Sequence, residues 1–127
     1  VKDPARFEIV VTSNLFGDIL TDLGAAIAGG MGLAAGANLN PEREFPSMFE
    51  PIHGSAPDIA GQGKANPLAT VWSASQMLDF FGYRQWGEKL IDIIEEILKE
   101  KKVLTPDLDG TATTSQVGDE VISKLRQ

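Results

Sequence analysis

The chain has 127 residues, of which 43% are hydrophobic, and it contains no cysteine. This length and apolar content suffice for one domain with a core, and the lack of cysteine excludes disulfides and thiolate metal sites. The formal net charge of −7 argues against a surface that binds nucleic acid or an anionic membrane, because both require basic patches.

Two further features bear on location. No secretory leader pattern stands at the start of the sequence. The charge-free run of residues 23–41 contains five glycines, so we do not expect it to span a membrane. We therefore expect a cytoplasmic protein.

The N-terminal residues predict a strand followed by a helix. Residues 6–12 are rich in β-branched side chains, which is typical of a buried strand. Ser13 or Asn14 is a suitable helix N-cap. Apolar residues recur at helical spacing from Leu15 onward, so we expect a helix over residues 14–29 with one wide apolar face.

A separate polar stripe on this helix carries Asn14, Asp18 and Asp22, spaced four residues apart. Side chains at this spacing lie about 5–6 Å apart at Cβ, so the two carboxylates repel each other unless a cation bridges them. Such oxygen ligands suit Mg²⁺ or Mn²⁺. The alternative is a solvated helix face, which the helix dipole favours near an N-terminus. The spacing alone leaves both interpretations open.

The next segment contains a glycine-rich turn. Residues 30–35 fit the GxGxxA dinucleotide fingerprint, but a helix rather than a strand precedes them and no acidic residue follows at the required distance. We predict a turn whose small residues allow close packing under a later loop. Residues 37–46 read as a strand end and a polar loop, and residues 47–50 as a short strand.

Residues 49–67 read Phe-Glu-Pro-Ile-His-Gly-Ser-Ala-Pro-Asp-Ile-Ala-Gly-Gln-Gly-Lys-Ala-Asn-Pro. Three prolines fix φ, and three glycines permit conformations that are closed to other residues. The segment also holds His53, the only histidine, together with Ser55 and Asp58. A rigid loop with a few polar groups suits close backbone approach to a polar ligand. The alternative is a long connecting loop.

Within this loop, residues 50–59 (Glu-Pro-Ile-His-Gly-Ser-Ala-Pro-Asp-Ile) and residues 65–67 (Ala-Asn-Pro) resemble the adenosine-binding loop of the β-hydroxyacid oxidative decarboxylases. This family comprises the isopropylmalate, isocitrate and tartrate/D-malate dehydrogenases. The resemblance implies an α/β fold of the isocitrate/isopropylmalate dehydrogenase type, with helices covering a mixed sheet. It spans only the C-terminal part of a full family member, so we expect a fragment or a protein whose N-terminal portion is supplied separately.

The resemblance implies NAD as cofactor. Asp58 would accept hydrogen bonds from the ribose hydroxyls and would repel a 2′-phosphate. The NADP-using isocitrate branch carries basic and phenolic groups where this chain has Asp58 and Ile59. Gln62 and Lys64 depart from the family pattern, which more often has a lysine and an apolar residue, and the extra cation at Lys64 is expected to alter affinity at the adenine end.

The other cofactor-binding residues implied by the resemblance are Glu50, His53, Gly54, Ser55, Ala56 and Asn66. His53 would lie near the adenine or its ribose, while the three small residues after it would offer backbone amides. Asn66 would read the adenine edge, and Glu50 would lie near the nicotinamide end. The alternatives are a structural imidazole for His53 and a solvated charge for Glu50.

Residues 12–22 (Thr-Ser-Asn-Leu-Phe-Gly-Asp-Ile-Leu-Thr-Asp) also resemble a family segment, the one whose two aspartates hold the catalytic divalent metal. The resemblance makes Asp18 and Asp22 the ligands of Mg²⁺ or Mn²⁺. The apolar face of the same helix, which begins near Leu15, resembles the face that packs against its twin in the family dimer. We therefore expect a homodimer.

The C-terminal half predicts helices. Pro67 suits the first residue of a helix, and residues 68–81 form a run that is apolar on most sides and therefore reads as a core helix. Residues 83–101 predict an amphipathic helix. We expect Trp72, in the first of these two helices, and Trp86, in the second, to be packing residues. A turn over residues 105–110 and a cap at Thr113 or Thr114 precede a final helix that ends at Leu125.

We thus expect residues 1–127 to form one partial domain: a metal and dimer helix (14–29), an NAD loop (49–67) and C-terminal helices (67–127). The implied reaction is the NAD-dependent oxidation and decarboxylation of a 2-hydroxy acid such as D-malate or tartrate. The family's catalytic residues lie upstream, so none is assigned here, and the chain alone is expected to be inactive. The alternatives are a non-catalytic nucleotide-binding or dimerisation module, and the equivalent part of an isopropylmalate dehydrogenase.

Overall fold

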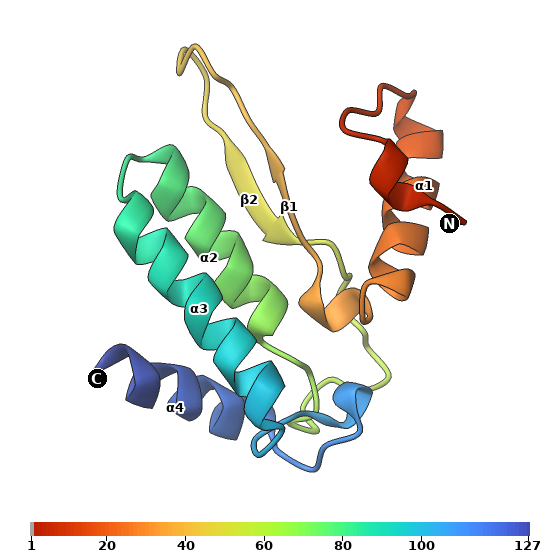
Figure 1. The fold of residues 1–127 in the computed structure, drawn as a ribbon. Helices are drawn as coiled ribbons and strands as arrows, with labels where there is room; N and C mark the ends of the chain where they lie inside the picture. Colours follow the sequence, from red (N-terminus) through yellow and green to blue (C-terminus); the bar gives the residue numbers. More distant parts are fainter. Residues whose placement is uncertain (1) are drawn as a thin grey trace.

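The computed structural model describes residues 2–127. Its elements, in chain order, are η1 (Pro4–Arg6), α1 (Asn14–Ile27), η2 (Met31–Leu33), β1 (Ala35–Asn38), β2 (Met48–Pro51), α2 (Leu68–Phe80), α3 (Arg84–Glu100), η3 (Pro106–Leu108) and α4 (Thr114–Leu125). Helices α2 and α3 lie side by side, α4 crosses below them, and α1 stands apart on the far side of the two strands (Figure 1). None of the helices in the described part of the chain is long and apolar enough to cross a membrane.

The sheet is a single antiparallel pair. Strands β1 and β2 align Ala35 with Pro51 and Asn38 with Met48, and both pack against α2. The aromatic rings of Phe49 and Phe80 lie 5.7 Å apart between centroids. The expected short strand is therefore confirmed, but residues 2–127 contain no parallel pair, so the mixed character of the expected sheet is absent from this part of the chain.

The strand predicted for residues 6–12 is wrong. Arg6 ends the short helix η1, and residues 7–13 form no regular element. Their apolar side chains are exposed, with Val11 94% exposed. A strand needs both a neighbouring backbone for its hydrogen bonds and a surface on which to bury one face. The described residues supply neither for this segment.

Helix α1 matches the expected helix and ends two residues early. The cause is the following glycine pair, because Gly29 and Gly30 adopt φ values of 123° and 112° that side chains disfavour. The apolar face is exposed: Leu15, Phe16, Ile19, Leu20, Leu23 and Ile27 are between 42% and 67% exposed. Within residues 2–127 this face is covered only in part, since residues between Pro4 and Thr12 line a pocket together with Leu20, Leu23 and Ile27.

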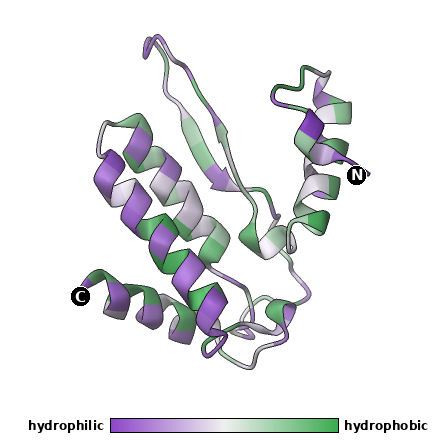
Figure 2. Cartoon of the chain, in the orientation of Figure 1, coloured by the Kyte–Doolittle hydropathy of each residue, from purple (hydrophilic) through white to green (hydrophobic). Residues whose placement is uncertain are grey.

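The core lies where α2, α3 and α4 meet. Its buried members are Leu68, Ile93, Ile94, Ile97, Val117 and Val121. Hydrophobic and hydrophilic residues alternate around α3 in Figure 2, as expected for an amphipathic helix. Helices α2 and α3 approach closely at Gly87, where an added Cβ would lie 2.9 Å from the backbone oxygen of Ser75.

The expectation that Trp72 and Trp86 are packing residues is not met. Trp72 is 40% exposed and Trp86 is 50% exposed. The run of residues 68–81 forms a helix, but its buried positions include small residues such as Ser73 and Ser75, and part of its apolar surface faces outward. An apolar helix is buried all round only when neighbours cover every side. Helix α3 and the two strands contact α2, and they leave Trp72 and Met77 exposed.

Helix α4 begins with the predicted cap. Thr113 accepts a hydrogen bond from the backbone N–H of Gln116, and the Gln116 side chain accepts one from the backbone N–H of Thr113. This reciprocal pair is a capping box, which satisfies two otherwise free N–H groups. The predicted turn before it contains η3.

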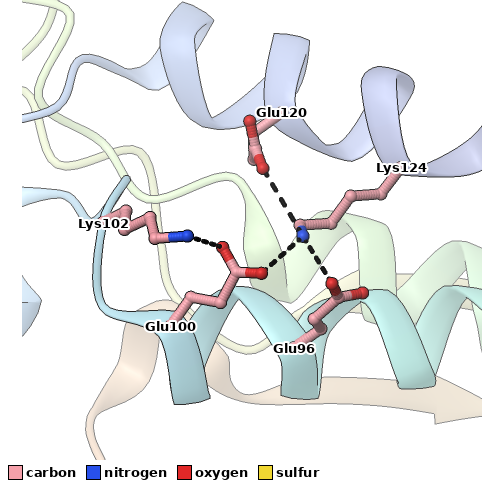
Figure 3. Close-up of polar contacts among 5 residues, drawn as sticks. All are labelled: Glu96, Glu100, Lys102, Glu120 and Lys124. Carbon is pink, nitrogen blue, oxygen red and sulfur yellow. Dashed lines mark hydrogen bonds and ion pairs between the residues drawn. The ribbon is translucent and has the colours of Figure 1, made fainter.

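An ion-pair cluster joins α4 to α3. The Lys124 side chain is 8% exposed, and its Nζ lies 2.7 Å from Glu96, 3.1 Å from Glu100 and 3.6 Å from Glu120 (Figure 3). Lys102 also pairs with Glu100, at 3.3 Å. The hydrogen bond to Glu96 raises the pKa of Lys124 despite its burial. The hydrogen bond from Lys124, and then that from Lys102, lowers the pKa of Glu100.

Candidate functional site

Two pockets of different character lie along the segment that starts at β2. The first, about 410 Å³, is lined by residues of α1, β1 and β2, and the second, about 480 Å³, by the loop after β2. Glu50 belongs to the first pocket, and His53, three residues later, belongs to the second. One continuous stretch of backbone therefore forms a wall of both pockets.

The first pocket, which we call the acidic pocket, contains Asp18, Asp22 and Glu50. Helical spacing places the two aspartates on one side of α1, one turn apart. Asn14 and Asp18 lie side by side on the helix, as the predicted polar stripe requires, because Asn14 Nδ2 donates to Asp18 Oδ2 at 3.5 Å. The fold thus brings residues that are far apart in sequence, the two predicted metal ligands and the carboxylate predicted for the nicotinamide end, to one pocket.

The donor set of the acidic pocket suits a hard divalent cation. Mg²⁺ and Mn²⁺ prefer oxygen ligands, and Mg²⁺ is usually held by one or two carboxylates with water and substrate completing the shell. Among the described residues, no three acidic or imidazole side chains are close enough to hold a metal ion by themselves. The oxygen chemistry of Asp18 and Asp22 is that of side chains that fill part of such a shell, and their role as metal ligands stays a prediction.

The second pocket, which we call the nucleotide pocket after the ligand expected for its loop, is formed by residues between His53 and Ala65 together with Thr114. The loop is a succession of tight turns, with Ile59 N donating to Ala56 O and Gln62 N to Ile59 O, both at 3.1 Å. Gly61 and Gly63 adopt φ values of 75° and 65°, which glycine adopts without the steric penalty that a side chain imposes.

Most of the predicted cofactor-binding residues line this pocket. Those that do are His53, Gly54, Ser55, Ala56 and Ile59. Asp58 is exposed and outside the lining, and its backbone oxygen accepts a hydrogen bond from Gln62 Nε2 at 2.8 Å. The ring of His53 also contacts its own loop, with Nδ1 3.1 Å from the backbone oxygen of Gly54.

Asn66 stands apart from the pocket and is 7% exposed. Its Nδ2 donates to Asp107 Oδ2 at 2.9 Å, and its Oδ1 accepts from the backbone N–H of Leu68 at 3.0 Å. The side chain thus ties the end of the loop both to η3 and to the start of α2. Gly32 packs beneath this pair, because a Cβ there would lie 2.5 Å from Asp107 Oδ2. The prediction of a turn that packs closely under the loop is confirmed.

Thr114 is a residue of the pocket that sequence analysis did not assign. Its backbone N–H donates to Gly63 O at 2.8 Å, and its Oγ1 donates to Ala65 O at 2.5 Å. The sequence marks Thr114 only as a possible helix cap, and nothing in the spacing of 49 residues from Ala65 shows that α4 begins against the loop. The folded structure alone makes this contact visible.

Comparison with known proteins places the chain in a large group of dehydrogenases. The profile of the isocitrate/isopropylmalate dehydrogenase family matches residues 1–121. The probable tartrate dehydrogenase/decarboxylase of Bacillus subtilis is 50% identical over 127 residues, which are 100% of this chain and 36% of the relative. The 3-isopropylmalate dehydrogenase of Thermobifida fusca is 53% identical over 127 residues, 100% of this chain and 35% of that protein.

The structural comparison agrees. The crystal structure of isocitrate dehydrogenase from Methylococcus capsulatus superposes with a TM-score of 0.90 and 40% sequence identity, covering 98% of this chain and 36% of that chain. The chain thus spans roughly a third of the length of the relatives that it matches, as the coverages of 35% and 36% show. The fold expected from the loop motif, that of isocitrate/isopropylmalate dehydrogenases, is confirmed for this part of the chain.

Proposed function

Because the chain belongs to the isocitrate/isopropylmalate dehydrogenase family, we propose that it supplies the metal-binding and adenosine-binding part of an NAD- and divalent-metal-dependent enzyme. The enzyme oxidises and decarboxylates a 2-hydroxy acid. The observation that carries the proposal is the shared wall of the two pockets, from Glu50 in the acidic pocket to His53 in the nucleotide pocket. A cofactor lying along this wall would have its adenosine at one end and its reactive ring near the metal ligands.

The chain's own residues bind and orient in this proposal. Asp18 and Asp22 hold the cation, and the loop from His53 to Ile59 presents backbone N–H groups and small side chains to the adenosine. Asp58 accepts from the ribose hydroxyls and Asn66 contributes at the adenine edge. When bound, NAD accepts the hydride and the divalent cation stabilises the negative charge that develops as CO₂ leaves.

The proton-transfer groups lie outside this chain in our proposal. Tyr83, the only tyrosine, is 59% exposed and lines neither the acidic nor the nucleotide pocket. None of the described residues that line the two pockets matches a catalytic position of the family. The chain alone is therefore expected to be inactive, and its partners are the upstream part of the enzyme and a second copy that packs on α1.

For the substrate we propose D-malate or tartrate. The support is the amino-acid sequence of residues 37–49, which resembles that of the tartrate/D-malate branch. An isopropylmalate substrate is the competing assignment, since relatives of both kinds are 50% to 53% identical to this chain.

Calorimetric titration tests the cofactor half of the proposal. The chain is titrated with NAD⁺ and with NADP⁺, each with and without Mn²⁺, both alone and mixed with the upstream two thirds of the Bacillus subtilis relative. We expect saturable binding of NAD⁺ that exceeds that of NADP⁺, because Asp58 repels a 2′-phosphate. Asp58→Ala should reduce the difference between the affinities for NAD⁺ and NADP⁺. Absence of NAD⁺ binding in both settings would overturn the cofactor assignment.

Turnover tests the catalytic half. The chain alone should give no NAD⁺ reduction, whereas the mixture should reduce NAD⁺ with D-malate or tartrate. Greater turnover with isopropylmalate would reassign the substrate. Binding of NAD⁺ by a mixture that shows no turnover with any of the three acids would instead support a non-catalytic nucleotide-binding module.

A further inference from the structure

The two pockets differ in charge. Among the described residues, three acidic and no basic residues line the acidic pocket, whereas Lys64 is the only charged residue that lines the nucleotide pocket. This contrast is unexpected in a chain with a net charge of −7. A lone cation at a pocket wall with no acidic side chain in the lining favours an anionic group in the occupant.

The charge of Lys64 is not used inside the structure. Within residues 2–127, the ion pairs all join side chains of residues 84–124, and none includes Lys64. Residue 64 is exposed. Its ammonium group is therefore available to a ligand without the breaking of an internal ion pair.

The backbone on both sides of Lys64 is held in place. Thr114 donates its backbone N–H to Gly63 O and its hydroxyl to Ala65 O, so one residue at the start of α4 secures both neighbours of Lys64. Helix α4 is in turn joined to α3 through Lys124 and its three glutamates. The Cα of Lys64 is thus fixed against the pocket, which reduces the conformational entropy lost when its side chain binds a ligand.

We propose that Lys64 binds a phosphate group of the nucleotide that occupies this pocket and so determines which adenosine derivatives the pocket accepts. The inference rests on the proposed function, because it assumes an adenosine in the pocket. A lysine ammonium binds phosphate as a compact charge with three donors. Asp58, the carboxylate expected to exclude a 2′-phosphate, lies outside the lining. The phosphate can therefore be on the 2′ or the 5′ side of the ribose, and the experiment distinguishes the two.

The test compares the binding of adenosine, 2′-AMP and 5′-AMP by calorimetry, with the chain alone and with the upstream part of the Bacillus subtilis relative present. The variant is Lys64→Met, which keeps an unbranched side chain one atom shorter and removes the charge. Lys2→Met makes the same change outside the pocket and serves as the control. For the unmutated chain we expect at least one phosphorylated nucleotide to bind about tenfold more tightly than adenosine, the size of effect typical of a hydrogen bond to a charged group.

Lys64→Met should abolish this preference and leave the affinity for adenosine unchanged, whereas Lys2→Met should retain it. The preference should also weaken as salt is raised, since it arises from an exposed charge. A preference for 2′-AMP would mean that Lys64 opposes the selectivity of Asp58, and a preference for 5′-AMP would assign Lys64 to the diphosphate side.

Two results would overturn the inference. Equal binding of adenosine and both nucleotides, or a preference that survives in Lys64→Met, would show that Lys64 does not bind phosphate while leaving the adenosine site intact. Failure of all three compounds to bind in both settings would remove the adenosine site and the inference together.

Discussion

Asp18 and Asp22 occupy neighbouring turns of α1 and line the same pocket as Glu50, which comes from β2. Three carboxylates around one pocket of about 410 Å³ create a negative potential that a divalent cation relieves. The double variant Asp18→Asn/Asp22→Asn keeps the shape of both side chains and removes two of the three charges. Its effect on cation binding therefore isolates the role of charge.

We predict that Mn²⁺ broadens the NMR amide signals of residues 36–38 and Glu50 at lower concentration than other signals. The double variant should need at least tenfold more Mn²⁺ for the same broadening, a difference of about 1.4 kcal/mol. Asp119→Asn, an exposed carboxylate of α4, is the matched control and should behave as the unmutated chain. Broadening that is uniform over the chain, or unaffected by the double variant, would contradict the assignment.

Asn66 shows how one side chain can have two roles. The amide bonds to Asp107 and to the backbone of Leu68, so it has a structural function whether or not a nucleotide is present. A carboxamide has two N–H donors and an oxygen with two lone pairs, which leaves one donor and one acceptor site free. The assignment of Asn66 to the adenine edge stays a prediction, because burial limits how a ligand reaches those free groups.

At the scale of elements, α4 connects the helical core to the nucleotide pocket. Its first residue holds the loop at Gly63 and Ala65, and its last turn is joined to α3 through Lys124. Val117 and Val121 lie between these ends in the core. A change in the packing of α4 on α3 is therefore expected to move the pocket wall.

The Lys124 cluster predicts a pH dependence of stability. The pKa of Glu100 in the folded chain is below its ordinary value of 4.5, because Lys124 and then Lys102 donate hydrogen bonds to it. A carboxylate with a lowered folded pKa stabilises the fold above its unfolded pKa and loses that contribution as pH falls through the folded value. We therefore expect the urea midpoint to fall as pH drops below 4.5, with a shallower fall in Glu100→Gln.

The control for this prediction is Glu44→Gln, which changes an exposed carboxylate in the loop between β1 and β2. Its pH profile of urea unfolding should parallel that of the unmutated chain. If the profile of Glu100→Gln has the same slope as that of Glu44→Gln below pH 4.5, the cluster does not contribute to stability in the way proposed.

At the scale of the whole molecule, apolar surface is left uncovered on α1 and on the segment before it. The apolar residues of α1 are between 42% and 67% exposed, and Val11, in the segment before α1, is 94% exposed. Contiguous apolar surface of this kind marks an interaction site. It matches the proposed partners, a second copy at α1 and the upstream part of the enzyme.

We predict that the chain self-associates through α1. Phe16→Glu/Leu20→Glu should shift it toward monomer in sedimentation equilibrium. Burial of each such side chain contributes about 1.5–3 kcal/mol, so the pair should weaken association at least a hundredfold or so. Ile122→Glu changes an apolar residue on α4 that is 47% exposed and should leave the association intact. An unchanged assembly in the α1 variant would place the interface elsewhere.

Local sequence was sufficient for most of the elements. The helical spacing of apolar residues predicted α1 and α3, Thr113 predicted the start of α4, and Pro67 the start of α2. These features depend on interactions within a few residues, such as caps and one-sided periodicity, so they can be read from the chain itself. The loop motif likewise predicted the family through its resemblance to the family's adenosine-binding loop, and the family profile over residues 1–121 confirms this prediction.

Tertiary structure decided which residues meet. The strand expected for residues 6–12 did not form, because a strand is stable only beside another strand, and residues 2–127 place none there. Trp72 and Trp86 were expected inside but are exposed, since burial depends on neighbours that the periodicity of one helix does not show. Thr114 contacts the nucleotide loop, and Glu50 lines one pocket with the two aspartates. These residues are distant in sequence, so only the folded chain shows that they meet. It also shows that Lys64 takes part in none of the ion pairs of residues 2–127.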